Sequence, residues 1–166
     1  MLPLQLRAWV SAPNYAQCNG DLIYINPYII HRLRDNPFKS IKREFPIDYS
    51  YGKSQTILTN IILPEGFEVK ENLADRMLIV GPNLVRYTRQ VQINGNIIQV
   101  KSKYDICKSE IEPEYYVQLK DLYAQMVAIQ SEQFVFSRIK STTKSPAPVV
   151  KPPQKDKKTV QKKGKK

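Results

Sequence analysis

Apolar and polar residues alternate along much of the chain, which is the pattern of half-buried β-strands. The alternation is clearest in two stretches, whose apolar members are Phe45, Ile47, Tyr49 and Tyr51, and Val85, Tyr87, Val91 and Ile93. Successive side chains of a strand point to opposite faces of the sheet, so this period places one face against a core and the other in water. The pattern therefore predicts a β-sandwich rather than a scaffold built around a catalytic pocket.

Turn residues divide this pattern into short strands. Asn94-Gly95 predicts a tight hairpin, Cys18-Asn19-Gly20-Asp21 predicts a second turn, and Leu63-Pro64-Glu65-Gly66 ends a strand, because these residue types tolerate or impose turn conformations. The strands that we expect cover residues 2–10, 21–25, 45–51, 55–63, 67–70, 76–80, 85–93, 97–104 and 134–136.

One segment has helical periodicity instead. Its apolar residues recur at spacings of four, three, four and three, at Tyr115, Leu119, Leu122, Met126 and Ile129. Pro113 occupies the first helical position, and Glu114 complements the positive end of the helix dipole. We expect a helix over about 113–130. Residues 1–140 should then form one antiparallel β-sandwich of immunoglobulin-like form, with this single C-terminal helix packed on it.

The last 26 residues differ in composition from the rest. Residues 141–166 carry nine lysines and one acidic residue, Asp156, so +8 of the net charge of +11 lies there and +3 lies on residues 1–140. With four prolines and few apolar residues, this tail should be disordered. A solubilising role is the simpler interpretation. A nucleic acid, an anionic surface or an acidic partner is the alternative, through Lys151, Lys155, Lys157, Lys158, Lys162, Lys163, Lys165 and Lys166.

The two cysteines, Cys18 and Cys107, allow one disulfide or two free thiols, and the sequence leaves both open. With His31 they give three Cys and His ligands in the whole chain, too few for a zinc site, so no metal is expected. The glycines fit neither the P-loop nor the dinucleotide spacing, so no cofactor is expected either. No transmembrane segment and no signal peptide are evident in the apolar pattern.

Catalytic candidates are weak. Cys18, His31 and either Asp35 or Asp48 occur in the order of a Cys-His-Asp triad, but no helical pattern follows Cys18 to lower its pKa. The acidic residues Glu110, Glu112 and Glu114 surround a helix start, where carboxylates are stabilising for structural reasons. We therefore expect no enzyme and no catalytic residue. A small cysteine hydrolase or transferase is the remaining catalytic hypothesis.

The ten tyrosines have two interpretations. Tyr24, Tyr28, Tyr49, Tyr51, Tyr87 and Tyr104 fall in or beside predicted strands, and Tyr115, Tyr116 and Tyr123 fall on the helix. A tyrosine-rich face can bind carbohydrate or peptide. The alternative is that they line the edge of the core with hydroxyls that reach solvent.

Several short motifs in order resemble the C-terminal β-domain of bacterial transglutaminase-like proteins, a domain that itself has no assigned function. They cover roughly residues 20–140: residues 20–27 (GDLIYINP), 36–38 (NPF), 43–49 (REFPIDY), 63–67 (LPEGF), 94–95 (NG) and 114–120 (EYYVQLK). In that family an N-terminal β-domain precedes a papain-like core with a Cys-His-Asp triad, and the β-domain resembled here follows that core. The resemblance transfers no catalytic residue.

The resemblance implies a non-catalytic accessory or interaction module of an exported, periplasmic or envelope parent protein. A transglutaminase-like core or another envelope protein would be its partner. The expected contact surfaces are exposed edge strands and the helical stripe from Tyr115 to Ile129. The compartment, the oligomeric state and the nature of Met1, a native start or a truncation, are left open.

Overall fold

The computed structural model describes residues 7–13 and 15–139, and this part of the chain is mainly β, with antiparallel sheets and one C-terminal α-helix. The basic tail and the first six residues lie outside it. In chain order, the elements are β1 (Gln17–Asn19), β2 (Leu22–Ile25), β3 (Ile47–Asp48), β4 (Lys53–Ile62), β5 (Phe67–Glu71), β6 (Arg76–Val80), β7 (Val85–Asn94), β8 (Ile97–Ile106), β9 (Glu110–Ile111), a 3-10 turn η1 (Pro113–Tyr115), α1 (Tyr116–Ser131) and β10 (Phe134–Arg138).

The largest sheet has the order β4-β8-β7-β6, and every pairing in it is antiparallel. Its centre is the hairpin of β7 and β8, which pair over ten residues each. Gly95 in the connecting turn has φ +60°, a left-handed conformation that glycine adopts at no steric cost. The hairpin predicted from Asn94-Gly95 is therefore confirmed.

A second four-stranded sheet has the order β1-β2-β10-β5. Strand β10 follows the helix and inserts between β2 and β5, so it pairs antiparallel with strands that precede it by more than sixty residues in sequence. The Asn19-Gly20 turn joins β1 to β2, and Gly20 has φ +59°. The first strand, β1, and the last strand, β10, therefore belong to the same sheet.

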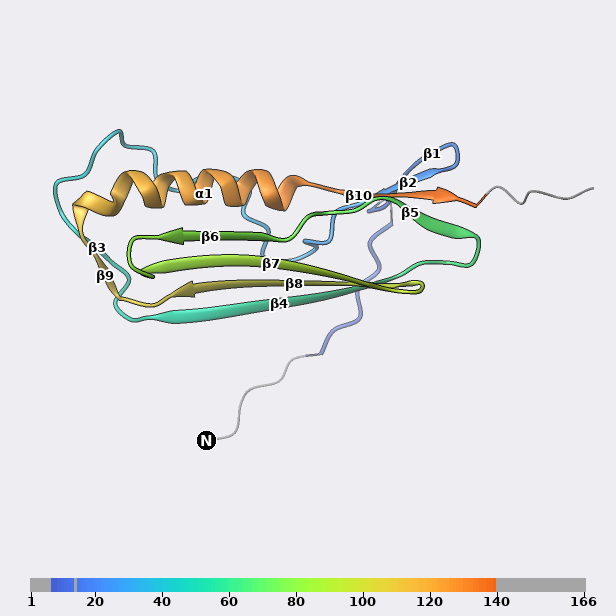
Figure 1. Ribbon diagram of the computed structural model, residues 1–166, viewed down its shortest axis with the longest axis horizontal. Coiled ribbons are helices and arrows are strands. Elements are labelled where there is room, and N and C mark those ends of the chain that lie inside the picture. The colour runs from blue at the N-terminus through green and yellow to red at the C-terminus, as the bar shows by residue number, and fades with distance from the viewer. Residues whose placement is uncertain (1–6, 14, 140–166) are drawn as a thin grey trace, which may run out of the picture.

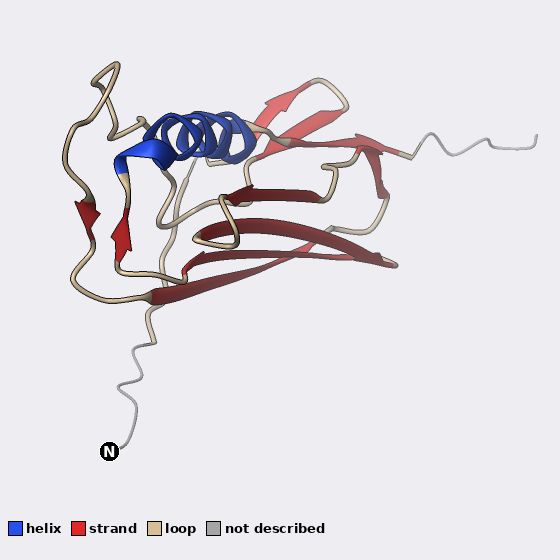
Figure 2. Ribbon diagram, turned by 60° about the vertical axis from the view of Figure 1, so that its left-hand side comes forward, coloured by secondary structure: helices blue, strands red, loops and turns tan. Residues whose placement is uncertain are grey.

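The helix and the second sheet lie end to end over one face of the long sheet (Figures 1 and 2). One core cluster joins α1 to β6 and β7, with Leu119, Leu122 and Met126 packed against Val80, Val85 and Tyr87. The other joins β10 to β8, with Phe134 and Phe136 packed against Ile98 and Val100. The immunoglobulin-like sandwich predicted from the sequence is not confirmed, because α1 occupies part of the layer that a second sheet would fill.

Two predicted strands are wrong in part. Of the expected strand 45–51, only Ile47–Asp48 pairs, with β9, while Phe45 and Tyr51 are exposed. Ser50 has φ +64° and its N–H donates to the Asp48 carboxylate, so the chain turns where the alternation predicted extension. Of the expected strand 2–10, the described residues 7–10 form no strand, and Trp9 is fully exposed.

A tyrosine-lined cavity as candidate functional site

A cavity of about 170 Å³ lies between α1 and the long sheet. Strands β4, β8 and β7 supply one wall, α1 supplies the opposite wall, and the segment after β2 contributes residues 31 and 33. The lining residues are His31, Leu33, Gln55, Ile57, Tyr87, Ser102, Lys103, Tyr104, Tyr123, Met126 and Gln130. Apolar walls with a few converging polar groups are typical of small-ligand sites.

These side chains point into the cavity because side chains alternate between the two faces of each strand. Ser102 and Tyr104 are two residues apart on β8, and Tyr87 pairs directly with Tyr104 across the ladder. All three lie on the face of the sheet that contacts α1. On the helix, Tyr123, Met126 and Gln130 follow each other at spacings of three and four, so they share one face. The two periodicities therefore converge on the same space.

Hydroxyl groups form a short buried chain beside the cavity. The Tyr28 and Tyr87 hydroxyl oxygens lie 2.9 Å apart, and the Ser102 hydroxyl donates to the Tyr28 hydroxyl over 3.0 Å. Burial raises the pKa of Tyr87 well above its ordinary value, and the neighbouring Tyr28 hydroxyl raises it further. Tyr87 is therefore neutral at physiological pH.

A second hydroxyl group cluster joins the helix to the sheet. The Tyr104 and Tyr123 hydroxyl oxygens lie 2.6 Å apart. Tyr49 lies beside them, and its hydroxyl oxygen is buried without a hydrogen-bond partner among the described residues. Burial raises the pKa of Tyr104 and of Tyr49 far above the ordinary tyrosine value, and the close hydroxyl of Tyr123 adds to both shifts.

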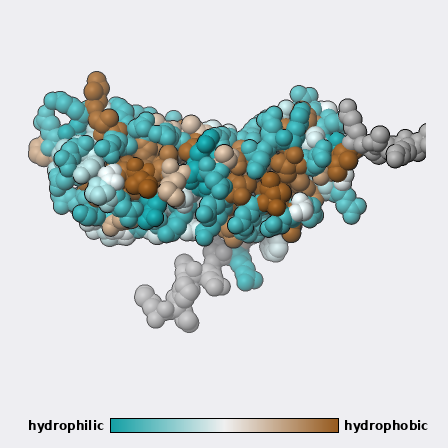
Figure 3. Space-filling view, viewed as in Figure 1, coloured by the Kyte–Doolittle hydropathy of each residue, from teal (hydrophilic) through white to brown (hydrophobic). Residues whose placement is uncertain are grey.

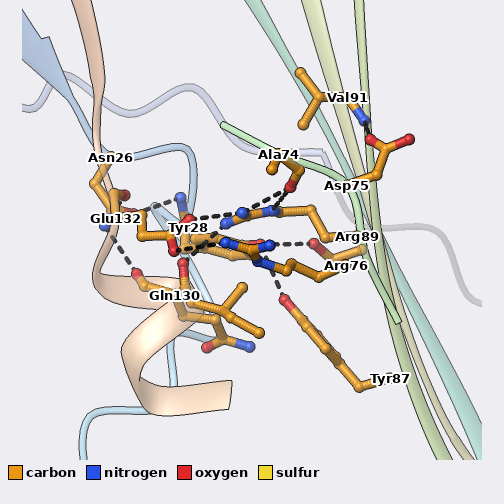
Figure 4. A network of polar contacts seen from close by, with 12 residues as sticks. Asn26, Tyr28, Ala74, Asp75, Arg76, Tyr87, Arg89, Val91, Gln130 and Glu132 are labelled. Carbon is orange, nitrogen blue, oxygen red and sulfur yellow. Dashed lines mark hydrogen bonds and ion pairs between the residues drawn. The ribbon is translucent and has the colours of Figure 1, made fainter. Parts of the chain in front are cut away.

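A buried polar network fixes the end of α1 next to the cavity (Figure 4). Arg89 is fully buried and donates to the backbone oxygens of Ala74 and Ile129 and to the Glu132 carboxylate. The Asn26 side chain donates to the backbone oxygens of Gln130 and Glu132. The turn that positions Gln130 in the cavity wall is therefore held from two sides.

Gln130 connects this network to the cavity. Its side-chain oxygen accepts a hydrogen bond from the Leu33 N–H over 2.6 Å, so it holds the segment after β2 against the helix. His31, two residues earlier, has φ +56°, an uncommon conformation for a residue other than glycine. His31 is exposed, and it also lines the cavity mouth.

Sequence reasoning did not single out Arg89, Ser102 or Gln130. The signal for Arg89 was present in the alternation of β7, because residues 85, 87, 89 and 91 share one face and three of them are apolar. A charged residue at such a position predicts a buried ion with dedicated partners.

The predicted catalytic candidates are not brought together. Cys18 lies in β1 and Asp48 in β3, which are at opposite ends of the molecule (Figure 1). The Asp48 carboxylate accepts the Ser50 N–H, and no hydrogen bond joins any two of Cys18, His31, Asp35 and Asp48 in the described ranges. Cys18 and Cys107 are both free and exposed, so the disulfide that the sequence left open is absent.

The acidic residues Glu110, Glu112 and Glu114 line a separate open groove of about 630 Å³, together with Cys107 and Lys108. Within the described part of the chain, no three His, Cys, Asp or Glu side chains gather in a way that would hold a metal ion. No helix there is long and apolar enough to cross a membrane. The lysines from Lys151 to Lys166 lie outside the described residues.

The expected contact stripe on the helix is not available to a partner. Leu119, Leu122, Met126 and Ile129 are buried against the sheet, because this stripe is the core-facing side of α1. Exposed apolar residues lie instead on the two edge strands of the long sheet, at Met77 and Ile79 on β6 and at Leu58 and Ile62 on β4. On the face shown in Figure 3, hydrophobic side chains gather in two areas, which hydrophilic side chains separate.

Comparison with known proteins gives a family and a fold. One solved structure matches, the crystal structure of "a putative protease" from Parabacteroides distasonis ATCC 8503, with a TM-score of 0.57 and 17% sequence identity. The match covers 73% of this chain and 24% of that one, so the chain spans about a quarter of its length. No curated protein matches. The family model of a domain of unknown function with solved structure, DUF3858, matches residues 21–136, so the chain belongs to that family.

Proposed function

We propose that this domain is a non-catalytic accessory module, which docks onto a catalytic core of the transglutaminase-like class within a larger protein. One observation carries the proposal. The same fold occupies 24% of the chain of a protein described as "a putative protease". The motif order between residues 20 and 120 supports it from the sequence, because it resembles the domain that follows a papain-like core in transglutaminase-like proteins.

The proposal also includes that the fold is a modified β-sandwich. The core cluster around Phe134 and Phe136 has side chains from both four-stranded sheets, as the centre of a sandwich does. We infer that α1 replaces strands of the second layer in the remaining half. A two-layer body with a packed core suits a module that holds a fixed position against a catalytic core.

The docking surface that the geometry favours is the free edge of β6. This strand ends the long sheet, carries the exposed side chains of Met77 and Ile79, and has neither proline nor lysine to discourage pairing. A groove of about 280 Å³ runs between it and α1, where Gln118, Asp121 and Gln125 offer polar groups. An extended segment of the core would add to this edge through backbone hydrogen bonds.

A cross-linking experiment tests the docking. A photoreactive phenylalanine derivative is placed at Met77, and in a matched control at Leu58, which is similarly exposed (65% and 54%) but lies on the opposite edge strand. After irradiation in cells of the source organism, we expect position 77 to cross-link to a sequence with a papain-like core. Equal cross-linking at both positions, or none at 77, would contradict the proposal.

A second experiment tests the non-catalytic role. The purified chain is assayed for amide hydrolysis and for transamidation of a glutamine peptide. We expect rates no higher than buffer, unchanged in Cys18→Ser. Turnover that Cys18→Ser abolishes would instead support the cysteine hydrolase or transferase hypothesis. An antibody to residues 141–166, used on fractionated cells, gives the size of the native protein and its compartment.

A further inference from the structure

The cavity between α1 and the long sheet has room for a single ring. Its volume is about 170 Å³, and an apolar protein cavity of about 150 Å³ is known to hold benzene. Drug-sized and cofactor-sized ligands need roughly 300–1,000 Å³. A nucleotide, an oligosaccharide or a stretch of peptide backbone is therefore too large, whereas one six-membered ring fits.

Apolar side chains from three separate elements would contact such a ring. Ile57 projects from β4, Met126 projects from α1, and Leu33 comes from the segment after β2. A methionine sulfur makes favourable contacts with aromatic rings, and its flexible side chain adapts to their shape. The walls therefore favour an aromatic occupant over an aliphatic polar one.

The tyrosine hydroxyls have hydrogen atoms to spare. Tyr49, Tyr104 and Tyr123 carry three hydroxyl donors, and a single hydrogen bond, between Tyr104 and Tyr123, is formed among them. Each hydroxyl has one donor and two acceptor sites. Tyr104 and Tyr123 both line the cavity, so one of them has a hydrogen left to donate to an oxygen placed there.

The residues that line the cavity also disfavour a charged ligand. It contains no carboxylate, and its ionisable groups besides the tyrosines are His31 and Lys103. Lys103 is engaged with Asp105, whose carboxylate lies 2.9 Å from its ammonium nitrogen. An anionic ligand would lose its hydration without gaining a free counter-charge inside, which is costly. A neutral ligand avoids this cost.

We propose that this cavity is a binding site for one neutral aromatic ring that carries a hydrogen-bonding oxygen, which is the chemistry of a phenol. The ring packs among Leu33, Ile57 and Met126, and its oxygen accepts a hydrogen bond from the Tyr104–Tyr123 pair. The ring enters past His31 and Gln55. A free phenolic compound and the tyrosine side chain of a peptide share this chemistry. The site does not depend on the proposed docking through β6.

Methyl NMR of the methionines tests the proposal on the full chain. Met126 lines the cavity, whereas Met77 lies exposed on β6 and reports non-specific binding. With p-cresol as the probe, we expect a saturable shift of the Met126 methyl signal and none at Met77. Toluene should bind more weakly because it lacks the oxygen, and benzoate should not bind. An unsaturable shift, or equal binding of p-cresol and benzoate, overturns the proposal.

Two variants locate the binding. Ile57→Trp fills the cavity and should abolish the Met126 shift, whereas Leu58→Trp, on the other face of the same strand, should leave it unchanged. The double variant Tyr104→Phe, Tyr123→Phe removes both hydroxyl donors of the cavity pair and should weaken p-cresol about tenfold, the effect of one hydrogen bond, with toluene unaffected. If Ile57→Trp does not fold, the double variant Tyr104→Phe, Tyr123→Phe decides between the outcomes, and equal p-cresol affinity in that variant and the wild type overturns the proposal.

A further binding measurement distinguishes a free phenolic compound from the tyrosine side chain of a protein partner. N-acetyl-tyrosine amide carries the same phenol on a peptide backbone. Its binding at lower concentration than p-cresol assigns the site to a tyrosine of a protein partner. Binding of p-cresol without binding of the amide assigns the site to a free phenolic compound, because the mouth then excludes the backbone.

Discussion

The Arg89 guanidinium is completely buried, and its Nη2 atom donates to the Glu132 carboxylate over 2.6 Å. The same side chain donates to the backbone oxygens of Ala74, before β6, and of Ile129, in the last turn of α1. One side chain therefore links a central strand of the long sheet to the helix C-terminus and to the loop between β5 and β6. A cation at a helix C-terminus also complements the helix dipole.

Replacing Arg89 should destabilise the domain strongly. Arg89→Met removes four hydrogen bonds, and it takes the buried guanidinium away from the Ala74 and Ile129 carbonyl oxygens and from the Glu132 carboxylate, so we expect a loss of about 3–5 kcal/mol in the free energy of unfolding. The control is Arg138→Met, because Arg138 is exposed and lies 3.8 Å from the equally exposed Asp21, and should cost about 1 kcal/mol or less. Urea denaturation measures both. Similar losses in the two variants would show that Arg89 has no special role.

Gly81 should be intolerant of a side chain, and Gly95 should be tolerant. Both have positive φ, +53° and +60°, so alanine is strained at either position by about 1–2 kcal/mol. At Gly81 an added Cβ would also lie 2.8 Å from the Tyr115 ring and 2.9 Å from Leu84, whereas at Gly95 it meets open space. We expect Gly81→Ala to cost about 1–3 kcal/mol more than Gly95→Ala. Equal costs would contradict the close packing of Tyr115.

The buried tyrosines should make the domain sensitive to alkali. Burial raises the pKa of Tyr49, Tyr87 and Tyr104 in the folded state, so the folded protein holds these protons more tightly than the unfolded chain, where the value is about 10. The resulting stability is complete below pH about 10 and is lost as the pH rises above it. Absorbance of tyrosinate and far-UV circular dichroism, followed together, should show that these residues ionise only as the domain unfolds.

A tyrosine variant checks the cause of this alkaline unfolding. Tyr104→Phe removes one of the three groups, so the free energy of unfolding should fall less steeply with pH above 10 than in the wild type. A stability that is independent of pH between 9 and 12, or an unchanged slope in Tyr104→Phe, would contradict the interpretation.

The long sheet and the helix could be predicted because local patterns determine them. The alternation in β7 and β8, the Asn94-Gly95 turn and the stripe from Leu119 to Ile129 each specify an element without knowledge of the rest of the chain. The helix begins within the predicted range and ends at Ser131, one residue beyond it. The buried residues of these elements recur at the same spacings as their apolar residues.

The cavity and the second layer could not be predicted, because they depend on contacts between residues far apart in sequence. Strand β10 pairs with β2 across more than a hundred residues, and Gln130 binds Leu33 across ninety-seven. The prediction of a strand over residues 45–51 was wrong for a related reason. Its alternation is genuine, but a partner exists only for Ile47 and Asp48, and an alternating segment without a partner does not form a strand.

Both cysteine thiols should react readily in the native protein. Cys18 and Cys107 are exposed and unpaired, so a chromogenic thiol reagent should titrate two thiols per chain without denaturant. Reduction beforehand should not change that number. Cys18→Ser and Cys107→Ser should each alter the free energy of unfolding by less than about 0.5 kcal/mol, as expected for surface substitutions. A titration of zero thiols that rises to two after reduction would indicate a disulfide that the structure does not contain.

The lysine-rich tail should account for any binding of nucleic acid. Residues 141–166 carry +8 of the net charge of +11, without arginine to read base edges or aromatic residues to stack on bases. We expect the full chain to bind duplex DNA without sequence preference, with an affinity that falls steeply as salt rises, because binding by lysines releases condensed counterions. Deletion of residues 141–166 leaves +3 on the domain and should abolish this binding. Fluorescence anisotropy of labelled DNA across a salt series measures the DNA affinity of the full chain and of the deletion variant.

Binding that persists after the deletion and in 0.5 M salt would instead place a nucleic-acid surface on the folded domain, since exposed charges are screened at that ionic strength.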